Sequence, residues 1–216
     1  MHIPDGILPP PVWIAGFGVT ALATGLTLRQ INHTSDPYEQ IPKASLMTAA
    51  FFVGSALYLP LGPTSIHLLL NGMMGIILGL YSLPAILVGL IFQAIIVGHG
   101  GLTTLGINGV ILGLPALLAR PVFLLYRRFP QSYGIRWSMG AMAFLASALT
   151  TALTVLIFFL LLISSLDQRL DVVAEQQAIL VLSLSHLPLL LVEGLVAAFL
   201  VVFLHKVRPE LLEDPS

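Results

Sequence analysis

The longest stretch of the sequence without a charged side chain covers 76 residues, from Ala44 to Ala119. Three further charge-free runs cover residues 6–28, 137–166 and 176–192. A soluble domain needs charged surface along its helices, whereas a hydrocarbon core about 30 Å thick needs about 20 apolar residues per helix. Because 57% of the residues are hydrophobic and only 9% are charged, we predict a polytopic membrane protein.

The apolar runs divide at proline, glycine and charge clusters into seven expected helices. We place them at residues 12–30, 44–60, 65–80, 83–98, 105–126, 137–164 and 181–205. A tight turn is expected between the third and fourth helices, from Leu80 to Pro84. Residues 153–163 are apolar on all sides, which argues against the alternating pattern of a membrane β-barrel. The expected fold class is all-α, with one transmembrane domain over residues 1–216.

The lysine and arginine residues predict how this bundle is oriented. If the amino terminus lies outside, eight of the nine fall at inner loops and inner helix ends: Arg29, Lys43, Arg120, Arg127, Arg128, Arg136, Lys206 and Arg208. Only Arg169 falls outside. Basic residues favour the cytoplasmic side of membrane proteins. We therefore expect an outside amino terminus and a cytoplasmic carboxyl terminus.

The composition also excludes several classes of protein and site. A net charge of −1 with scattered basic residues leaves no stripe for nucleic acid. The absence of cysteine excludes disulfides, thiolate zinc sites and thiol nucleophiles. The first residues contain no basic segment before the apolar stretch, so we expect no cleavable signal peptide and take Met1 as the mature terminus.

Four of the six histidines fall at or near the expected outer face: His2, His67, His99 and His186. A free amine followed by His2 offers three nitrogens, namely the Met1 amine, the His2 backbone amide after deprotonation, and the His2 imidazole. The resulting chelate rings are flat, so His67 in the same plane would complete a square-planar site. Such nitrogen sites suit Ni²⁺ or Cu²⁺, with Co²⁺ binding somewhat more weakly. The alternative is that each histidine only hydrogen-bonds a neighbouring helix.

Other polar residues are expected around these ligands. Asn71 lies four residues after His67 and would share its helix face. The glycine-rich turn that contains His99 is either an ordinary turn or a lid over the metal. The candidates for surrounding or lid residues are Asp5, Asn71, Gln93, His99 and Asn108. Glu193, within the last helix and seven residues after His186, either pairs with a polar group or faces a cavity.

Four segments resemble one known family, the substrate-capture subunit of energy-coupling-factor transporters for cobalt and nickel (the CbiM/NikM type). They are MHIPDG at residues 1–6, PTSIHL at 63–68, GGLT with LGIN at 100–108, and the segment from His186 to Glu193. The first of these is highly specific, and the glycine loop supports it.

This resemblance implies a seven-helix fold whose amino terminus inserts into the bundle. It also implies a metal site made by the Met1 amine, the His2 amide and imidazole, and the His67 imidazole. Many members carry Asp where this chain has His99, which changes the electrostatics of the loop.

The implied function is metal capture for an ATP-driven importer in the cytoplasmic (inner) membrane of a prokaryote. Co²⁺ or Ni²⁺ would be cargo, with no permanent cofactor, and the His99 loop slightly favours cobalt for cobalamin biosynthesis. The chain itself lacks the Gly-Lys-Ser/Thr sequence of an ATPase, since its two lysines follow Pro42 and His205. The implied partners are a transmembrane coupling subunit, two ATP-binding subunits and a small accessory membrane subunit.

Two other functions would also use metals in a membrane. A self-contained permease or channel for divalent ions usually has charged groups along its path, but Glu193 is the only acidic residue within an expected span. An intramembrane metal-dependent hydrolase typically carries a His-Glu-x-x-His helix, which this sequence lacks. We therefore expect a transport subunit and not an enzyme.

Overall fold

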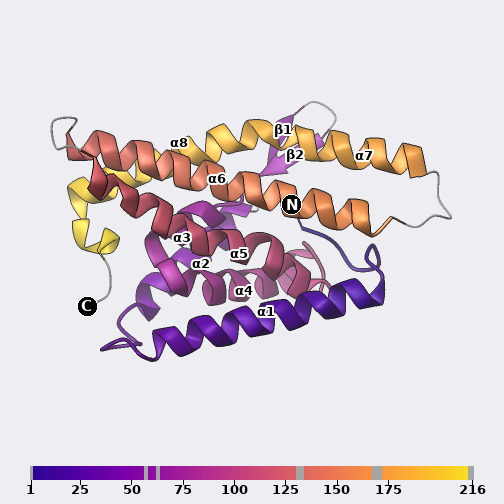
Figure 1. Ribbon diagram of the computed structural model, residues 1–216, viewed down its shortest axis with the longest axis horizontal. Helices are drawn as coiled ribbons and strands as arrows, with labels where there is room; N and C mark the ends of the chain where they lie inside the picture. The colour runs from indigo at the N-terminus through magenta and orange to yellow at the C-terminus, as the bar shows by residue number, and fades with distance from the viewer. Residues whose placement is uncertain (1, 56–57, 62–63, 130–133, 167–171, 214–216) are drawn as a thin grey trace.

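Helices make up most of the computed structural model, which describes residues 2–55, 58–61, 64–129, 134–166 and 172–213 (Figure 1). The helices are α1 (Pro10–Ile31), α2 (Ile41–Ser55), α3 (Asn71–Leu78), α4 (Ser82–Phe92), α5 (Leu105–Phe123), α6 (Ile135–Ser164), α7 (Val172–Ser185) and α8 (Leu187–Val207). Short helical turns cover Gly79–Tyr81, Gln93–Val97, Leu124–Arg128 and Pro209–Leu212. The strands β1 (Tyr58–Leu61) and β2 (Thr64–His67) form one hairpin.

Five segments within the described ranges are long and apolar enough to cross a membrane. They are Pro10–Ile31, Asn71–Val97, Leu105–Arg128, Ile135–Ser164 and Val172–Val207. Large apolar side chains on their outer surfaces are exposed, as lipid-facing residues would be, with Leu22 at 66% and Phe199 at 76%. These features confirm the prediction of an all-α membrane protein.

The segment Asn71–Val97 reverses direction within its length. As one straight helix, its 27 residues would extend about 40 Å. However, the rings of His67 and His99, which flank this segment, have centroids only 5.2 Å apart. The reversal falls at Gly79–Tyr81, where Gly79 adopts a φ of 55° that favours glycine. The turn overlaps the expected one only at Leu80 and Tyr81, because α4 already begins at Ser82 and includes Pro84.

The prediction that a helix covers residues 65–80 is wrong at its amino-terminal end. Residues 64–67 form β2, in which His67 is paired with Tyr58 of β1, and α3 begins only at Asn71. Leu70 has a φ of 54° and is the only non-glycine residue with a positive φ among those described. This left-handed conformation stops α3 from extending back towards His67. His67 and Asn71 therefore do not share a helix face.

Two other boundaries differ from expectation. The second expected helix, 44–60, ends at Ser55 in the structure. The last expected helix, 181–205, is instead the pair α7 and α8, which meet at His186 and together cover 36 residues. At about 54 Å this pair is longer than the hydrocarbon core of a membrane, and its amino-terminal end carries polar residues such as Gln176. Arg169 lies outside the described residues.

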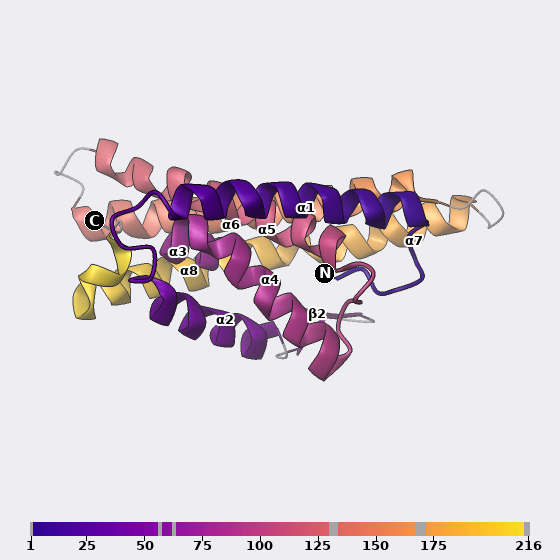
Figure 2. The same ribbon diagram turned by 90° about the horizontal axis from the view of Figure 1, so that it is seen from below.

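The helices pack in layers around α5. Figures 1 and 2 show α6 beside α8, with α3 and α5 beneath them and α1 on the far side of α5. α1 can approach α5 closely because Gly16 has no side chain. A Cβ at this position would lie only 2.8 Å from the backbone nitrogen of Ile107. The Thr20 hydroxyl donates a hydrogen bond to the Gly106 carbonyl at 2.6 Å. The small residues of α1 thus serve packing within the chain.

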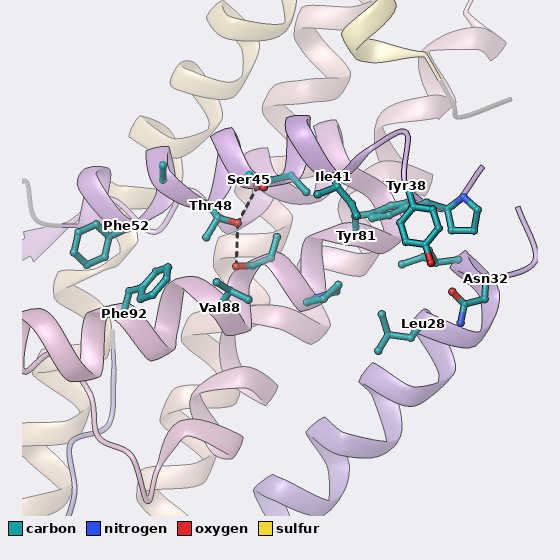
Figure 3. Close-up of a pocket in the computed structure, with 16 residues that line it drawn as sticks. Leu28, Asn32, Tyr38, Ile41, Ser45, Thr48, Phe52, Tyr81, Val88 and Phe92 are labelled. Atoms are coloured by element: carbon teal, nitrogen blue, oxygen red, sulfur yellow. Dashed lines mark hydrogen bonds between the residues drawn. The ribbon is translucent and has the colours of Figure 1, made fainter. Parts of the chain in front are cut away.

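A groove of about 620 Å³ lies between the end of α1, α2 and α4 (Figure 3). Its lining is apolar and includes Phe52, Tyr81 and Phe92. The Thr48 hydroxyl donates its hydrogen bond within the protein, to the carbonyls of Ala44 at 2.8 Å and Ala85 at 3.3 Å. No histidine or carboxylate is among the lining residues, so the metal chemistry expected from the sequence must be sought elsewhere.

Candidate metal centre

The amino-terminal segment is tied to the start of α5 by its own backbone. The Ile3 N–H donates to Asn108 Oδ1 at 2.9 Å, and Asn108 Nδ2 donates to the Ile3 carbonyl at 3.0 Å. The Thr104 hydroxyl donates to the same carbonyl at 2.6 Å. Ile3 itself is 1% exposed. These bonds hold the segment inside the bundle and place His2 next to the loop before α5.

Asp5 fastens the same segment from its other side. One oxygen of its carboxylate accepts hydrogen bonds from the Thr103 amide at 3.0 Å, the Thr103 hydroxyl at 2.5 Å and the Thr104 amide at 3.3 Å. The Thr103 hydroxyl is the main cause that lowers the pKa of Asp5 below its usual value. A Cβ on Gly101 would collide with this carboxylate, so glycine is required there. Asp5 and Asn108 therefore anchor the terminal segment; that they surround a bound metal stays a prediction.

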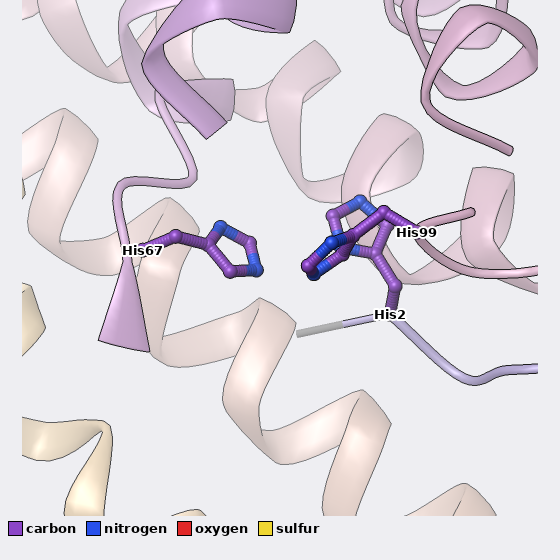
Figure 4. A group of neighbouring side chains, drawn as sticks. All are labelled: His2, His67 and His99. Atoms are coloured by element: carbon purple, nitrogen blue, oxygen red, sulfur yellow. The ribbon is translucent and has the colours of Figure 1, made fainter. Parts of the chain in front are cut away.

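Three imidazole rings converge where this segment meets the hairpin and the loop before α5 (Figure 4). His2, His67 and His99 each offer one ring nitrogen, and these atoms all lie within 4.8 Å of one another. The rings of His2 and His67 are inclined by 24°, with centroids 5.2 Å apart. The His99 ring stands nearly perpendicular to both, at 83° and 87°. Three segments separated by up to 97 positions thus bring neutral nitrogen donors to one point.

Hydrogen bonding orients the His67 ring towards this point. Its Nδ1 lies 3.1 Å from the carbonyl oxygen of Leu68, the next residue. A carbonyl only accepts, so Nδ1 carries the proton in this contact, and Nε2 retains its lone pair. Metal-binding histidines are commonly held by such a bond to a backbone carbonyl.

Burial keeps the three rings neutral. Removal from water lowers the pKa of His2 well below its ordinary value, and lowers the pKa of His67 to about 3. The pKa of His99 is lowered for the same reason. A proton on any ring would also repel a proton on the others. At neutral pH the site therefore presents lone pairs, the form that binds a metal ion.

Buried polar atoms without partners mark the same place. Among the described residues, neither ring nitrogen of His2 has a hydrogen bond of good geometry, and both are buried. Gln93 lies beside His2, and its Oε1 is also buried without a partner, while its Nε2 donates to the Ser55 hydroxyl at 2.7 Å. Buried polar groups in folded proteins nearly always have partners. Unpaired nitrogens next to two further imidazoles fit a site that receives a cation.

The remaining candidates do not join the three rings. Asn71 donates to the Leu112 carbonyl at 3.0 Å and to the Thr154 hydroxyl at 2.9 Å, so its amide joins α3 to α5 and α6. His186 bonds the Leu182 carbonyl through Nδ1 at 2.7 Å, at the junction of α7 and α8. Met1 lies outside the described residues.

Comparison with known proteins identifies the family. Residues 2–211 match the model of the CbiM family, described as the cobalt uptake substrate-specific transmembrane region. The chain belongs to the CbiM family. It is thus a substrate-specific transmembrane component for cobalt or nickel uptake, a multi-pass protein of prokaryotic transporters and not an enzyme.

Individual relatives agree with this assignment. A putative metal transport protein of Haemophilus influenzae is 29% identical over 98% of this chain and 97% of its own length. A cobalt transport protein, CbiM, of Geobacter sulfurreducens is 33% identical over 98% of this chain and 61% of its own length. A fused nickel transport protein, NikMN, of Rhodobacter capsulatus is 34% identical over 50% of this chain and 31% of its own length.

Solved structures show the same fold. The crystal structure of a transition metal transporter superimposes with a TM-score of 0.69, covers 96% of this chain and 93% of that one, and is 19% identical in sequence. A truncated transition metal transporter gives a TM-score of 0.65, with 95% of this chain and 99% of that one covered. A putative fused cobalt transport protein, CbiMQ, of Methanocorpusculum labreanum matches 98% of this chain over 36% of its own length. In that relative, the region similar to this chain is therefore part of a longer, fused transport protein.

Proposed function

We propose that this chain captures Co²⁺ or Ni²⁺ at its outer face through the Met1 amine, the His2 amide and imidazole, and the His67 imidazole. Cobalt destined for cobalamin biosynthesis is the preferred cargo. The observation that carries this proposal is the convergence of His2 and His67 in one cluster, in which the two ring nitrogens of His2 are buried and have no described partner. The flat chelate of the first two residues and one imidazole in its plane supply four nitrogens.

We assign His99 to the same metal as a further donor. Its ring nitrogen lies within 4.8 Å of those of His2 and His67. Its ring is nearly perpendicular to those of His2 and His67, which suits a donor above the plane of the other nitrogens. A fifth donor favours ions that accept more than four ligands, and this supports cobalt over square-planar nickel.

The proposed topology has seven passes, with the amino terminus outside and the carboxyl terminus in the cytoplasm. α1, α2, α5, α6 and the pair α7 and α8 would each cross once. The chain from Thr64 to Val97 would supply the other two passes, one on each side of Gly79, and the first of these would include β2 and residues 68–70, because the eight residues of α3 extend only about 12 Å. His67 and His99 then lie on one side of the membrane, since the segment between them leaves and returns.

The proposed transport cycle requires partner subunits. A transmembrane coupling subunit, two ATP-binding subunits and a small accessory membrane subunit would tilt the loaded chain and expose the site to the cytoplasm. The fused CbiMQ relative supports the presence of partners. Co-purification of the chain with each of these subunits tests the assembly.

The sharpest test of the chelate adds one glycine before Met1 and leaves the rest of the chain unchanged. The added residue turns the terminal amine into an amide and displaces the new amine from the site. We expect the affinity for Co²⁺ and Ni²⁺, measured by calorimetry on the purified protein, to fall at least tenfold. A chain with the glycine added at its carboxyl end is the matched control. Unchanged affinity in the amino-terminal variant would overturn the chelate.

Substitution of His67 tests the other half of the site. His67→Ala removes one imidazole but leaves the amino-terminal chelate, so we expect weaker binding and loss of metal uptake in cells that also express the partner subunits. His33→Ala, in the loop after α1, is the control and should bind metal normally. Normal metal affinity in His67→Ala would remove His67 from the site.

A further inference from the structure

Glu193 is a buried carboxylate of α8 that is not part of the three-histidine cluster. It is 1% exposed and lies within an apolar helix. A charged group within a membrane span is costly unless it is paired. Its partners are backbone N–H groups: Oε1 accepts from the amides of Leu69 and Leu70 at 2.5 and 3.1 Å, and Oε2 accepts from Leu70 at 3.1 Å.

These amides stand at a point where the backbone needs support. They precede α3, whose first N–H groups have no partner within the helix. A carboxylate that accepts such bonds is favoured by the charge and by the helix dipole. The same bonds hold Leu70 in its left-handed conformation, with a φ of 54°, which is unfavourable for a residue with a side chain.

The supported turn continues directly into the metal site. Leu68 lies between His67 and the two amides that Glu193 binds, and its carbonyl holds Nδ1 of His67 at 3.1 Å. A continuous path therefore runs from the Glu193 carboxylate through the 68–70 backbone to the His67 ring. α8 is placed by packing along α6; the Ser147 hydroxyl of α6 also donates to the Glu193 main-chain carbonyl at 3.2 Å, a bond separate from those that the carboxylate makes to the turn.

We propose that Glu193 is a positioning residue for His67, so that the placement of α8 sets how tightly the site holds its metal. The carboxylate fixes the turn at residues 68–70, and the turn fixes the direction of the His67 lone pair. A shift of α8 would then release the turn and weaken binding without any change in the ligands themselves. This inference rests on the proposed role of His67 as a ligand.

The test compares Glu193→Gln with Ser147→Ala. The glutamine keeps the shape of the side chain but loses its charge and one acceptor, whereas Ser147→Ala removes a bond to the same residue without touching the turn. We expect Glu193→Gln to raise the Kd for Co²⁺ about ten- to a hundredfold, the usual effect of losing a group that orients a ligand. Ser147→Ala should bind within twofold of the unmodified chain. An unchanged Kd in a folded Glu193→Gln protein overturns the proposal.

A double-mutant cycle separates positioning from general stability. If Glu193 acts through His67, Glu193→Gln should cause no further loss of affinity when His67 is already Ala. Equal losses in both backgrounds overturn the proposal. If His67→Ala alone leaves the affinity unchanged, the proposed ligand set fails, and this result is distinct from failure of the positioning role.

Hydrogen exchange on the unmodified chain provides a measurement that does not depend on the variants folding. Addition of Co²⁺ should slow amide exchange at residues 68–70 as well as at Ile3, because fixing the His67 ring also fixes the turn. Protection confined to Ile3 would overturn the link from the metal through His67 to Glu193.

Discussion

At the scale of single residues, the site depends on groups whose roles differ although their types are alike. His2, His67 and His99 share one cluster, while His186 bonds a carbonyl at the junction of two helices. Likewise, the carboxylate of Asp5 binds the terminal segment to the loop before α5, whereas that of Glu193 binds the backbone before α3. These differences follow from the partners that each side chain meets, and residue type alone does not reveal them.

Substitution of His99 distinguishes a metal donor from a lid residue. His99→Ala should weaken Co²⁺ binding and shift the visible absorption band of the bound ion, because one nitrogen leaves the coordination sphere. A lid residue would change the rates of binding and release but leave the band in place. Absorption spectra of the Co²⁺-loaded protein provide the measurement, with His205→Ala as the control at the far end of α8. A band identical to that of the unmodified chain would exclude His99 as a ligand.

At the scale of the elements, glycines set the distances between helices. Gly75 of α3 faces α5 so closely that a Cβ would collide with the Ala116 carbonyl. Gly16 does the same for α1, where a Cβ would lie within 2.9 Å of three atoms of Ile107. In a membrane, where apolar contact with lipid is no worse than contact with protein, such close approach is what allows helices to associate.

A larger residue at Gly16 should therefore separate α1 from α5. In Gly16→Val the added side chain must displace the backbone of α5 at Ile107, because neither helix has room for it. We expect a clear loss of thermal stability in detergent, of about 1–3 kcal/mol as for other overpacked cores, together with weaker metal binding. Gly25→Ala is the matched control on the same helix, since a Cβ there meets nothing within 4 Å. Equal stability of the two variants would contradict the packing role of Gly16.

At the scale of the whole molecule, the fold brings together what the chain keeps apart. The reversal at Gly79 returns the chain to the side from which it came, and the terminal segment inserts between the hairpin and α5. At the end of the bundle away from the histidine cluster, Arg120 donates to the Ile76 carbonyl at 2.6 Å and to the Leu212 carbonyl at 3.1 Å. These bonds connect the helical turn Pro209–Leu212 to α3 and α5. The site and its supports are therefore properties of the assembled bundle.

Burial of neutral histidines makes the metal-free protein sensitive to acid. In the unfolded chain His67 takes up a proton near its ordinary pKa of 6.5, but in the folded chain its pKa is about 3. Between these values the unfolded state binds more protons, so the free energy of unfolding falls as the pH falls, by about 1.4 kcal/mol per pH unit for this residue.

Thermal unfolding of the metal-free protein at pH 7.5, 6.0 and 5.0 measures this effect. The free energy of unfolding should decrease as the pH is lowered from 7.5 to 5.0. This decrease should be smaller in His67→Phe, because phenylalanine does not titrate. The same pH dependence in both proteins would show that His67 is not buried in its neutral form.

The sequence alone predicted the class of protein and most of the membrane segments, and it led to the proposal that Met1 and His2 are metal ligands. These features are local: lipid requires long apolar runs wherever they occur, and a chelate of Met1 and His2 needs only adjacent residues. The turn near Leu80 was also predicted, because glycine and proline interrupt helices regardless of their surroundings.

The tertiary structure decided what depends on distant contacts. Residues 64–67 pair as a strand although their composition is compatible with a helix, and α3 starts later because Leu70 is held in a left-handed conformation. His99 joins the cluster, and Glu193 binds the backbone of residues 69–70, only because segments far apart in the chain lie side by side. The spacing of residues along a sequence cannot report such contacts, because helix packing brings the segments together only in the folded bundle.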